Sequence, residues 1–528
     1  MSVDSLGISR RRMLAGLGIG GAALLAGCKA AVDQSNGPET SGVAGKVARG
    51  GTVTMAIPDD LIPANLFTNS NTAITTMIGL VYESLIRYPN DRVVPQPRLA
   101  TSWQLSADGM TLALDLRRGV RFHSGREFTS KDVAFSIKTY ADPKWNGQEL
   151  STAQAIRSVD TSQKYRAVLH LAHPMSNIFD VLDTIVIVDS ETIDGLATGK
   201  KYVGTGPFTF ESWTPNSSLV FKRNEHYWQA GRPYVDGVRV NVVPDPTSLL
   251  AQIKSGQADL AEGLQFLDAK TLGSQSGFGA IQLVGAEEQI YVGANVHAEP
   301  LNDVRVRQAI AYAIDRDRIM SEVFQGSGYS INLPWPKYSS AYDAAKNRTY
   351  AYDPDRAKSI LKKVGGSLPA IPYTYGTTVP AYGATAQIVQ SNLADVGIKV
   401  ELDPIDATHF VTELIGAQFK GLWTTYHSWA QYTPSTLAVS AYPFNASHNA
   451  SHYVSSRYSQ DANASWVTPH ATTAAAVTDY GKVSDDLLQA LFLIEIGIVQ
   501  LQWVTGQGLQ GVSYTKRAEI DLTNASFG

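Results

Sequence analysis

Four histidines between residues 409 and 452 are the side chains best suited to metal binding in this sequence. His448 and His452 stand four apart, and on a helix this spacing would place both imidazoles on one face, as in many zinc sites. The intervening Asn-Ala-Ser and the nearby Pro443 favour a loop instead. We therefore expect polar surface histidines and no metal site, and we leave open that one histidine, such as His427 or His409, contacts a ligand.

Two glycine-rich stretches resemble nucleotide-binding loops, but their positions and spacing do not fit such loops. Gly16, Gly18 and Gly21 fit G-x-G-x-x-G, yet they lie in an apolar N-terminal run and not between a strand and a helix. In the stretch at 195–200 only three residues separate the glycines, and Lys201 stands where a phosphate loop has Ser or Thr. We therefore expect no nucleotide and no other cofactor.

Catalytic signatures are missing as well. The sequence holds no H-E-x-x-H, G-x-S-x-G or C-x-x-C motif. Its 48 Asp and Glu residues could supply an acid and a base, but the sequence alone pairs none of them. We expect no catalytic residues, and a secreted hydrolase that uses carboxylates stays as an alternative.

Cys28 is the only cysteine, which excludes a disulfide framework. Arginines at 10–12 precede a mostly apolar run that ends at Gly27, the pattern of an export signal. Fifteen apolar residues span only about 22 Å as a helix, too short for a bilayer. The run ends in Leu-Ala-Gly-Cys, which resembles a bacterial lipobox, and the paired arginines resemble a twin-arginine signal.

We therefore expect residues 1–27 to be removed and Cys28 to carry a lipid that holds the protein on the extracytoplasmic face of the cell membrane. A plain cleaved signal and a retained anchor are the alternatives. The stretch that follows Cys28 lacks hydrophobic periodicity and is rich in Gly, Ala, Ser and polar residues, as flexible linkers are. We expect residues 28–50 to be a tether.

Composition bounds the rest of the chain. With 44% hydrophobic, 17% charged and 9% aromatic residues, the chain is globular and is not disordered, collagen-like or a coiled coil. A net charge of −4 offers no basic surface for a phosphate backbone, so we expect no nucleic-acid partner. A length of 528 residues predicts about three domains.

Strand patterns and capped helices alternate along the body. Thr129 and Asp132 are spaced as in a capping box, and Asp353-Pro354 combines a helix cap with a proline at the first helical position. This alternation predicts a multi-domain α/β protein. We expect a strand at 50–57, hairpins at 103–116 and 208–221, helices at 129–140, 306–314, 315–324, 353–364 and 385–396, and a strand at 399–402.

Several segments with recognisable motifs stand in a fixed order along the chain. They are YESLI at 82–86, PQPRLATSW at 95–103, VRFHSG at 120–125, FTSKDV at 128–133, GTGPF at 204–208, RNEHYW at 223–228, GRPYVD at 231–236, PD at 244–245, KSGQAD at 254–259, DVRVRQA at 303–309 and YDPDRA at 352–357. Gly204, Gly206, Asp303 and Arg305 in these segments fit tight turns and helix starts, so we expect structural roles for them. Together the segments resemble the dipeptide/oligopeptide-type solute-binding proteins of ABC importers, bacterial extracellular solute-binding family 5.

The resemblance implies an α/β, two-lobed periplasmic-binding-protein-like fold (type II, cluster C) with an extra domain inserted in the first lobe. It also implies that the two lobes close on the ligand, which excludes water and strengthens each polar contact. The expected parts are the signal at 1–27, the tether at 28–50, lobe I at 51–80, 200–285 and 499–528, the inserted domain at 81–199, and lobe II at 286–498.

In peptide-binding members of this family a Trp followed closely by an Asp lies late in the second lobe, and the Asp pairs with the peptide's amino group. Trp429 matches the Trp, but Gln431 is the nearest candidate for the acid, because no Asp or Glu occurs between Glu413 and Asp461. An α-ammonium enclosed without a counter-charge would be strongly disfavoured. This departure favours a ligand without an obligatory free amine.

The region around Trp429 is dense in aromatic residues, which suit sugars, opine-like conjugates, aromatic acids or a metallophore. Asp59 and Asp60, after the first strand, lie where ligands of the family meet the first lobe, and either could restore the missing negative charge. The expected ligand-binding residues are Trp429, Gln431, Tyr432, His427, Tyr426, Asn69, Asp59 and Asp60.

The resemblance implies a non-catalytic, lipid-anchored, monomeric receptor that delivers a small solute to an ABC permease and its ATPase. The solute is expected to be peptide-like or, given the missing acid, a sugar, opine-like or aromatic compound. The alternatives are the hydrolase named above and a receptor that senses the solute without importing it.

Overall fold

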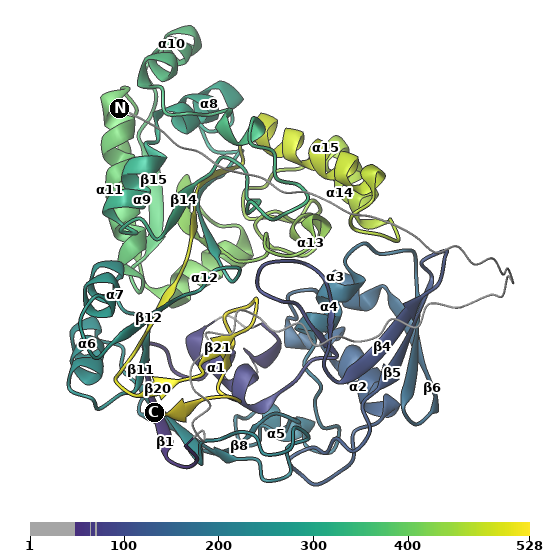
Figure 1. The fold of residues 1–528 in the computed structure, drawn as a ribbon. Helices are drawn as coiled ribbons and strands as arrows, with labels where there is room; N and C mark the ends of the chain where they lie inside the picture. Colours follow the sequence, from purple (N-terminus) through teal and green to yellow (C-terminus); the bar gives the residue numbers. More distant parts are fainter. Residues whose placement is uncertain (1–47, 64, 69–70) are drawn as a thin grey trace, which may run out of the picture. The chain divides into compact units, whose positions relative to one another are not determined.

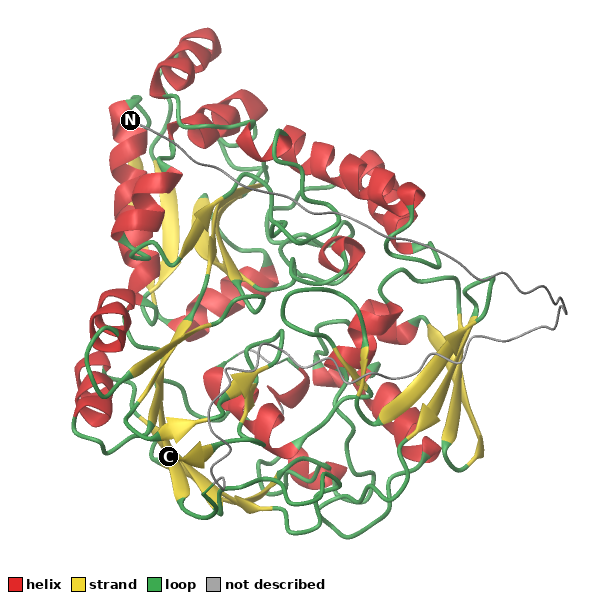
Figure 2. Ribbon diagram, viewed as in Figure 1, coloured by secondary structure: helices red, strands yellow, loops and turns green. Residues whose placement is uncertain are grey.

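The computed structural model describes residues 48–63, 65–68 and 71–528 (Figure 1). The predicted signal at 1–27, Cys28, nearly all of the predicted tether and Asn69 lie outside the described residues. In the described part, helices and strands are mixed along the chain, which confirms the α/β class (Figure 2). None of the helices described there is long and apolar enough to cross a membrane.

The largest sheet has seven strands in the order β12-β19-β11-β1-β10-β9-β8. Central β1 runs parallel to β10 and β11, and β19, from the last 30 residues of the chain, lies antiparallel between β11 and β12. Its strands are β1 (Thr52–Ile57), β8 (Phe208–Thr214), β9 (Ser218–Arg223), β10 (Gly237–Val242), β11 (Leu260–Glu262), β12 (Gly279–Gln282) and β19 (Gln502–Thr505).

A second sheet has six strands in the order β14-β18-β13-β17-β15-β16. Its central strands are largely buried on both faces, and every residue of β18 is buried. Its strands are β13 (Glu288–Ala294), β14 (Gly328–Ser330), β15 (Ile371–Gly376), β16 (Val400–Ile405), β17 (Leu422–His427) and β18 (Leu493–Val499).

A third, antiparallel sheet of four strands has the order β4-β5-β7-β6, and three two-stranded pairs complete the β-structure. The four strands are β4 (Ala100–Leu105), β5 (Thr111–Leu116), β6 (Ile156–Gln163) and β7 (Arg166–Leu171). The pairs are β2 (Ile86–Arg87) with β3 (Gln96–Pro97), β20 (Leu509–Gln510) with β23 (Ser526–Phe527), and β21 (Ser513–Tyr514) with β22 (Ile520–Asp521).

Helices cover the sheets. α6 and α7 pack on the seven-stranded sheet, α9 and α11 on the six-stranded sheet, and α2 on the four-stranded sheet. The α-helices are α1 (Thr72–Val81), α2 (Ser130–Tyr140), α3 (Leu150–Gln154), α4 (Ile178–Thr184), α5 (Ile193–Leu196), α6 (Pro246–Lys254), α7 (Phe266–Gly273), α8 (Val304–Ala313), α9 (Arg316–Glu322), α10 (Pro354–Val364), α11 (Pro380–Asp395), α12 (Ala407–Gly416), α13 (Pro434–Val439), α14 (Ser456–Trp466) and α15 (Ala474–Ala490).

The predicted local elements are confirmed where short-range chemistry sets them. α2 begins with the Thr129–Asp132 capping box, and the Asp353 side chain accepts a hydrogen bond from the Arg356 amide at the start of α10. Both predicted hairpins form, as β4–β5 and β8–β9. Asp303 caps α8, which confirms its structural role.

Two predicted helix ends were wrong. α11 begins at Pro380, five residues before the predicted start, because that proline occupies the first helical position and supplies the required φ angle. α9 ends at Glu322 and not at Phe324, which follows the helix as a fully buried core side chain.

Gly204 and Gly206 serve close packing and not a tight turn. The Gly206 amide donates to the Val81 carbonyl at 2.9 Å, at the end of α1. A Cβ atom on Gly206 would lie 2.6 Å from the Val81 carbonyl carbon, and one on Gly204 would lie 2.1 Å from the Val81 oxygen. Only glycine lets the two backbones approach so closely.

Substitution of Gly206 by alanine should therefore lower the free energy of unfolding by about 2–3 kcal/mol, because the new methyl group overlaps the backbone. Gly481→Ala is the matched control. It lies inside α15, where an added Cβ meets nothing nearer than the Lys346 Nζ at 3.9 Å. We expect this control to be neutral or stabilising by about 0.5–1 kcal/mol. Urea denaturation of both variants measures the difference, and equal effects would contradict the packing argument.

Candidate functional site

The segment with Trp429, Gln431 and Tyr432 connects β17 to α13 and is buried. The exposed fractions of the three residues are 7%, 1% and 1%. The Trp429 and Tyr432 rings pack on each other with their centroids 5.5 Å apart. The sequence-predicted residues thus include one compact aromatic group, which two distant parts of the chain contact.

The first of these parts is α4, which presents two carboxylates. The Tyr432 hydroxyl donates to the Asp183 Oδ2 at 2.8 Å. Asp180 is fully buried and accepts four hydrogen bonds, from the Tyr88 hydroxyl (2.8 Å), the Thr433 amide (2.9 Å) and hydroxyl (3.0 Å), and the Thr436 hydroxyl (2.7 Å). Two carboxyl groups thus lie beside Tyr432 and Thr433, and they come from residues about 250 positions earlier in the chain.

The second part is the turn of the C-terminal β21–β22 hairpin. The Arg517 guanidinium lies 5.3 Å from the centre of the Trp429 ring, and the Gln431 Nε2 donates to the Lys516 carbonyl at 3.4 Å. The Lys516 ammonium donates to the Asn90 carbonyl at 2.7 Å. Burial lowers the pKa of Lys516 to about 8. The Arg517 side chain and the Lys516 backbone carbonyl thus contact the Trp429 segment, while the Lys516 ammonium is directed to Asn90.

Both α4 carboxyl groups hold protons more tightly than usual. Burial raises the pKa of Asp180 to about 6. Burial, assisted by the charge of Glu519, raises the pKa of Asp183 to about 7. Their hydrogen-bond donors oppose these shifts without cancelling them.

These pKa values predict that stability falls as the pH rises. An unfolded Asp has a pKa of about 3.9, so between about pH 4 and 7 the folded state binds more protons than the unfolded state. The stabilisation is present in acid and is lost as the pH passes the folded pKa. We expect a lower Tm at pH 8 than at pH 5, and a smaller difference in Asp183→Asn. An unchanged difference in that variant would contradict the assignment to Asp183.

A second acidic group lies where β11 of the seven-stranded sheet ends and β13 of the six-stranded sheet begins. Burial raises the pKa of Glu262, at the end of β11, to about 8, with Asp59 adding a repulsive charge. Burial also raises the pKa of Glu288, at the start of β13, to about 7. The Tyr426 ring is 4.9 Å from the Tyr382 ring, and the charge of Glu288 reaches both tyrosines. Asp59 and Tyr426, two of the predicted residues, thus both lie close enough to Tyr382 to interact with it electrostatically.

Asp60 has structural partners. Its carboxylate accepts hydrogen bonds from the Trp213 indole at 2.9 Å and from the Asn216 amide at 2.6 Å, at the turn of the β8–β9 hairpin. Asp59 accepts from the Thr72 hydroxyl at 2.9 Å, at the start of α1. A role of either carboxylate in ligand binding stays a prediction.

His427 lies inside the six-stranded sheet. Its Nε2 is 3.0 Å from the Glu495 Oε1, and both side chains are 2% exposed. The neighbouring Gln289 is fully buried, and neither of its side-chain polar atoms has a partner among the described residues. The other ring nitrogen of His427 is also without a partner there. Contact of His427 with a ligand stays a prediction.

The other histidines of this region lie in a loop and at the start of a helix. The segment around His448 and His452 is a loop, and His448 is exposed. His409 pairs with Asp406 at the start of α12. Within the part of the chain that the structure describes, no group of three or more His, Cys, Asp or Glu side chains could hold a metal ion.

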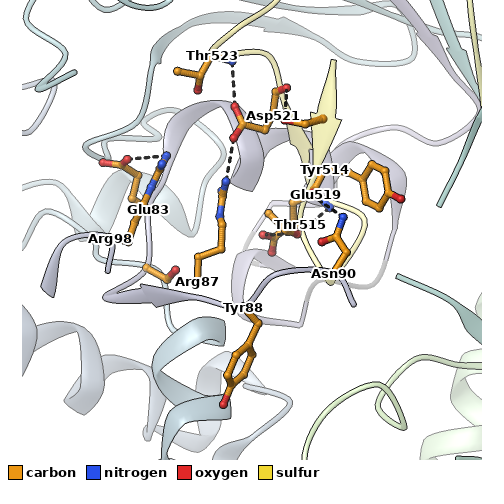
Figure 3. A network of polar contacts seen from close by, with 12 residues as sticks. Glu83, Arg87, Tyr88, Asn90, Arg98, Tyr514, Thr515, Glu519, Asp521 and Thr523 are labelled. Atoms are coloured by element: carbon orange, nitrogen blue, oxygen red, sulfur yellow. Dashed lines mark hydrogen bonds and ion pairs between the residues drawn. The ribbon is translucent and has the colours of Figure 1, made fainter. Parts of the chain in front are cut away.

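The resemblance motifs mostly build the scaffold. Glu83 is buried and accepts hydrogen bonds from the Thr205 and Tyr227 hydroxyls at 2.8 and 2.9 Å, and it pairs with Arg98 at 2.8 Å. In the same network Asp521 of β22 pairs with Arg87 at 2.8 Å (Figure 3). These contacts fix the C-terminal hairpin to the early part of the chain, which places its turn at Trp429.

Sequence reasoning missed four side chains of this site, namely Asp180, Asp183, Lys516 and Arg517. Asp180 and Asp183 stand three apart in a short apolar helix, a pattern that indicates a polar helix face. Lys516 and Arg517 occupy a turn, where charged residues are common. No pattern in the neighbouring sequence indicates that any of them contacts the segment around Trp429.

Comparison with known proteins gives concordant matches. Residues 94–460 match the family described as bacterial extracellular solute-binding proteins, family 5. Heme-binding protein A of Haemophilus influenzae is 29% identical over 313 residues, which cover 54% of this chain and 56% of that protein. Oligopeptide-binding protein AppA of Bacillus subtilis is 25% identical over 423 residues, which cover 74% of this chain and 76% of that protein.

Solved structures show the same fold. That of AppA from Bacillus subtilis in complex with a nonapeptide has a TM-score of 0.80 at 21% identity, and covers 92% of this chain and 100% of AppA. That of AgaA from A. tumefacien R10 in complex with agropinic acid has a TM-score of 0.80 at 22% identity, and covers 90% of this chain and 99% of AgaA. The predicted two-lobed α/β fold is thereby confirmed.

Proposed function

The chain belongs to the family 5 bacterial extracellular solute-binding proteins of ABC importers, and from this premise we propose that it is a lipid-anchored monomer that encloses a small solute between two lobes and delivers it to a permease. The predicted lobes and inserted domain correspond to the seven-, six- and four-stranded sheets in our proposal. Closure of such lobes excludes water and gives a permease a two-state signal.

The observation that carries the solute class is the pairing of the Trp429 segment with the C-terminal turn. Where peptide-binding relatives have an acid, this chain has the Gln431 amide, and the guanidinium of Arg517 lies over the Trp429 ring. A guanidinium binds carboxylates through two parallel hydrogen bonds, and an indole face binds flat or hydroxylated bodies. We propose a solute that carries a carboxylate on an opine-like or aromatic body.

The names of the relatives leave the solute open. They include proteins named for heme, oligopeptides and glutathione, and the neighbour AgaA was solved with agropinic acid. Oligopeptides and glutathione carry a free α-ammonium, whereas heme and agropinic acid do not, so the last two fit a carboxylate anchor better.

Native mass spectrometry of the purified protein, followed by calorimetric titration, tests the solute class. We expect a co-purified acid, or micromolar binding of opine-like or aromatic carboxylates, and no measurable binding of dipeptides. Tight binding of dipeptides with a free amine would contradict the argument from Gln431. Loss of uptake of the identified solute on deletion of the gene would support import, and unchanged uptake would favour a sensing role.

Lipid attachment at Cys28 has its own test. Cells fed an alkyne-tagged fatty acid should label the wild-type protein, and Cys28→Ala should lose the label and leave the membrane fraction. Trp429→Ala retains Cys28 and serves as the labelled control. A labelled Cys28→Ala protein would contradict the proposal, since the chain has no second cysteine.

A further inference from the structure

A cavity of about 410 Å³ lies beside the first described residues of the chain, away from the Trp429 segment. Its walls come from Arg49 and from the RNEHYW and GRPYVD motifs at 223–228 and 231–236. These motifs were singled out from the sequence, and ligand binding at the lobe interface does not explain their charges. Three arginines, Arg49, Arg223 and Arg232, line this motif cavity.

Among the described residues, only one of the three arginines pairs with carboxylates. Arg223 pairs with Glu225 at 3.0 Å and with Asp236 at 2.9 Å. Arg49 donates to the Gly231 carbonyl at 3.0 Å, and neither Arg49 nor Arg232 has a carboxylate partner among the residues described. The Nη1 of Arg232 is buried and has no hydrogen-bond partner in the same part of the chain.

The guanidinium groups of Arg49 and Arg232 lie against the same aromatic ring. Arg232 lies 3.8 Å and Arg49 lies 5.7 Å from the centre of the Tyr234 ring. Burial, together with the charge of Arg49, lowers the pKa of Arg232. Like charges held against one ring repel each other, and an anion between them removes the repulsion.

The backbone supports this arrangement. Gly231 has a φ of +76°, and a Cβ atom there would lie 2.9 Å from the Nη2 of Arg49. The glycine of this motif therefore leaves room for the guanidinium at the cavity wall. The Gly51 amide binds the Asp236 Oδ2 at 3.0 Å, which ties the start of β1 to the same wall.

We propose that the motif cavity binds a phosphate group through Arg49 and Arg232. Guanidinium groups are weakly hydrated and match the oxygens of phosphate in a bidentate geometry, and a donor buried without a partner gains most from such an anion. The phosphate comes either from the headgroup of an anionic phospholipid or from a free phosphate ester.

The headgroup source rests on the proposed lipid anchor. Arg49 is 21 residues after Cys28, and a linker of this length has a mean span of about 25 Å. If Cys28 carries the proposed lipid, Arg49 lies within about this distance of the membrane surface, and headgroup phosphates are within its reach. Binding of phosphate by Arg49 and Arg232 does not require the lipid anchor. The titration and the Cys28 labelling experiment can therefore fail independently of each other.

Calorimetric titration of the full chain with glycerol 3-phosphate at low salt is the first arm of the test. We expect saturable binding at one site, weakened about tenfold by Arg232→Ala or Arg49→Ala and less by Arg232→Lys, which keeps the charge but loses the fork. Arg239→Ala is the matched control, because Arg239 is an exposed arginine on β10 of the same sheet and lies outside the cavity. We expect the control to change affinity less than twofold.

Cosedimentation with vesicles of phosphatidylcholine, with and without phosphatidylglycerol, is the second arm. Weaker binding of Arg232→Ala than of Arg239→Ala to the anionic vesicles would support the headgroup source. Equal vesicle binding combined with titratable glycerol 3-phosphate would support the free ester. The proposal is overturned if glycerol 3-phosphate shows no saturable binding, or if Arg232→Ala and Arg239→Ala bind it equally while both keep the parental Tm.

Discussion

Replacement of Asp180 by alanine is expected to lower the free energy of unfolding by about 3–5 kcal/mol. The carboxylate accepts four hydrogen bonds from Tyr88, Thr433 and Thr436, all in a fully buried setting. Its removal leaves these donors without an acceptor and without water, at about 1–3 kcal/mol each before relaxation. Urea denaturation followed by circular dichroism measures the loss.

Two variants separate this network from a general effect of lost charge. Asp180→Asn keeps one acceptor oxygen and should be destabilised less than the alanine variant. Asp194→Ala removes an exposed carboxylate near α5 and should change stability by no more than about 0.5 kcal/mol. If Asp180→Ala stays within about 1 kcal/mol of the wild type, the four hydrogen bonds do not hold α4 against the Trp429 segment.

Replacement of Trp429 by alanine is expected to weaken solute binding about 100-fold, or about 2.7 kcal/mol. The indole packs on Tyr432 and lies under the Arg517 guanidinium. Alanine removes the flat face and releases the arginine. Calorimetric titration with the solute identified by native mass spectrometry measures the change.

The controls for Trp429 distinguish a binding role from a folding role. Trp429→Phe keeps an aromatic face and should lose about tenfold or less. Tyr352→Ala removes a ring that is 48% exposed and lies outside this segment, and it should leave affinity unchanged. If Trp429→Ala keeps its Tm and binds within about threefold of the wild type, the solute does not bind at this segment.

The sequence predicted those parts of the fold that short-range chemistry determines. The Thr129–Asp132 capping box and the Asp353-Pro354 helix start need only three or four neighbouring residues. The Asp108-Gly109 turn joins two strands of alternating pattern, and Gly109 adopts a φ of +68° that suits glycine. These elements could be predicted because the contacts that form them lie within a few residues of one another.

The partners of the candidate site could not be predicted in this way. Tyr432 meets Asp183 across 249 positions, and Gln431 meets Lys516 across 85. Contacts of this kind depend on how whole elements pack, and they leave no periodicity in the sequence. The sequence shows that no acid stands close to Trp429 along the chain. It does not show that the carboxylates of α4 lie beside Tyr432 and Thr433 in space.

Asp60 shows the opposite difficulty. Its position after the first strand indicates a solvated or ligand-facing loop, but its carboxylate binds the Trp213 indole and the Asn216 amide. The hairpin that supplies these donors lies about 150 residues later in the chain. A charged loop residue can thus be part of the scaffold when a later element brings donors to it.

The position of β19 has a consequence for biosynthesis. This strand, Gln502–Thr505, separates β11 from β12 in the seven-stranded sheet, so the sheet cannot be completed until nearly the whole chain has left the ribosome. Until then β11 has an unpaired edge that other nascent strands could join, and the late closure of so long a loop slows folding. Binding of a chaperone during synthesis would protect that edge, and any export route that carries folded proteins must wait for the last 30 residues.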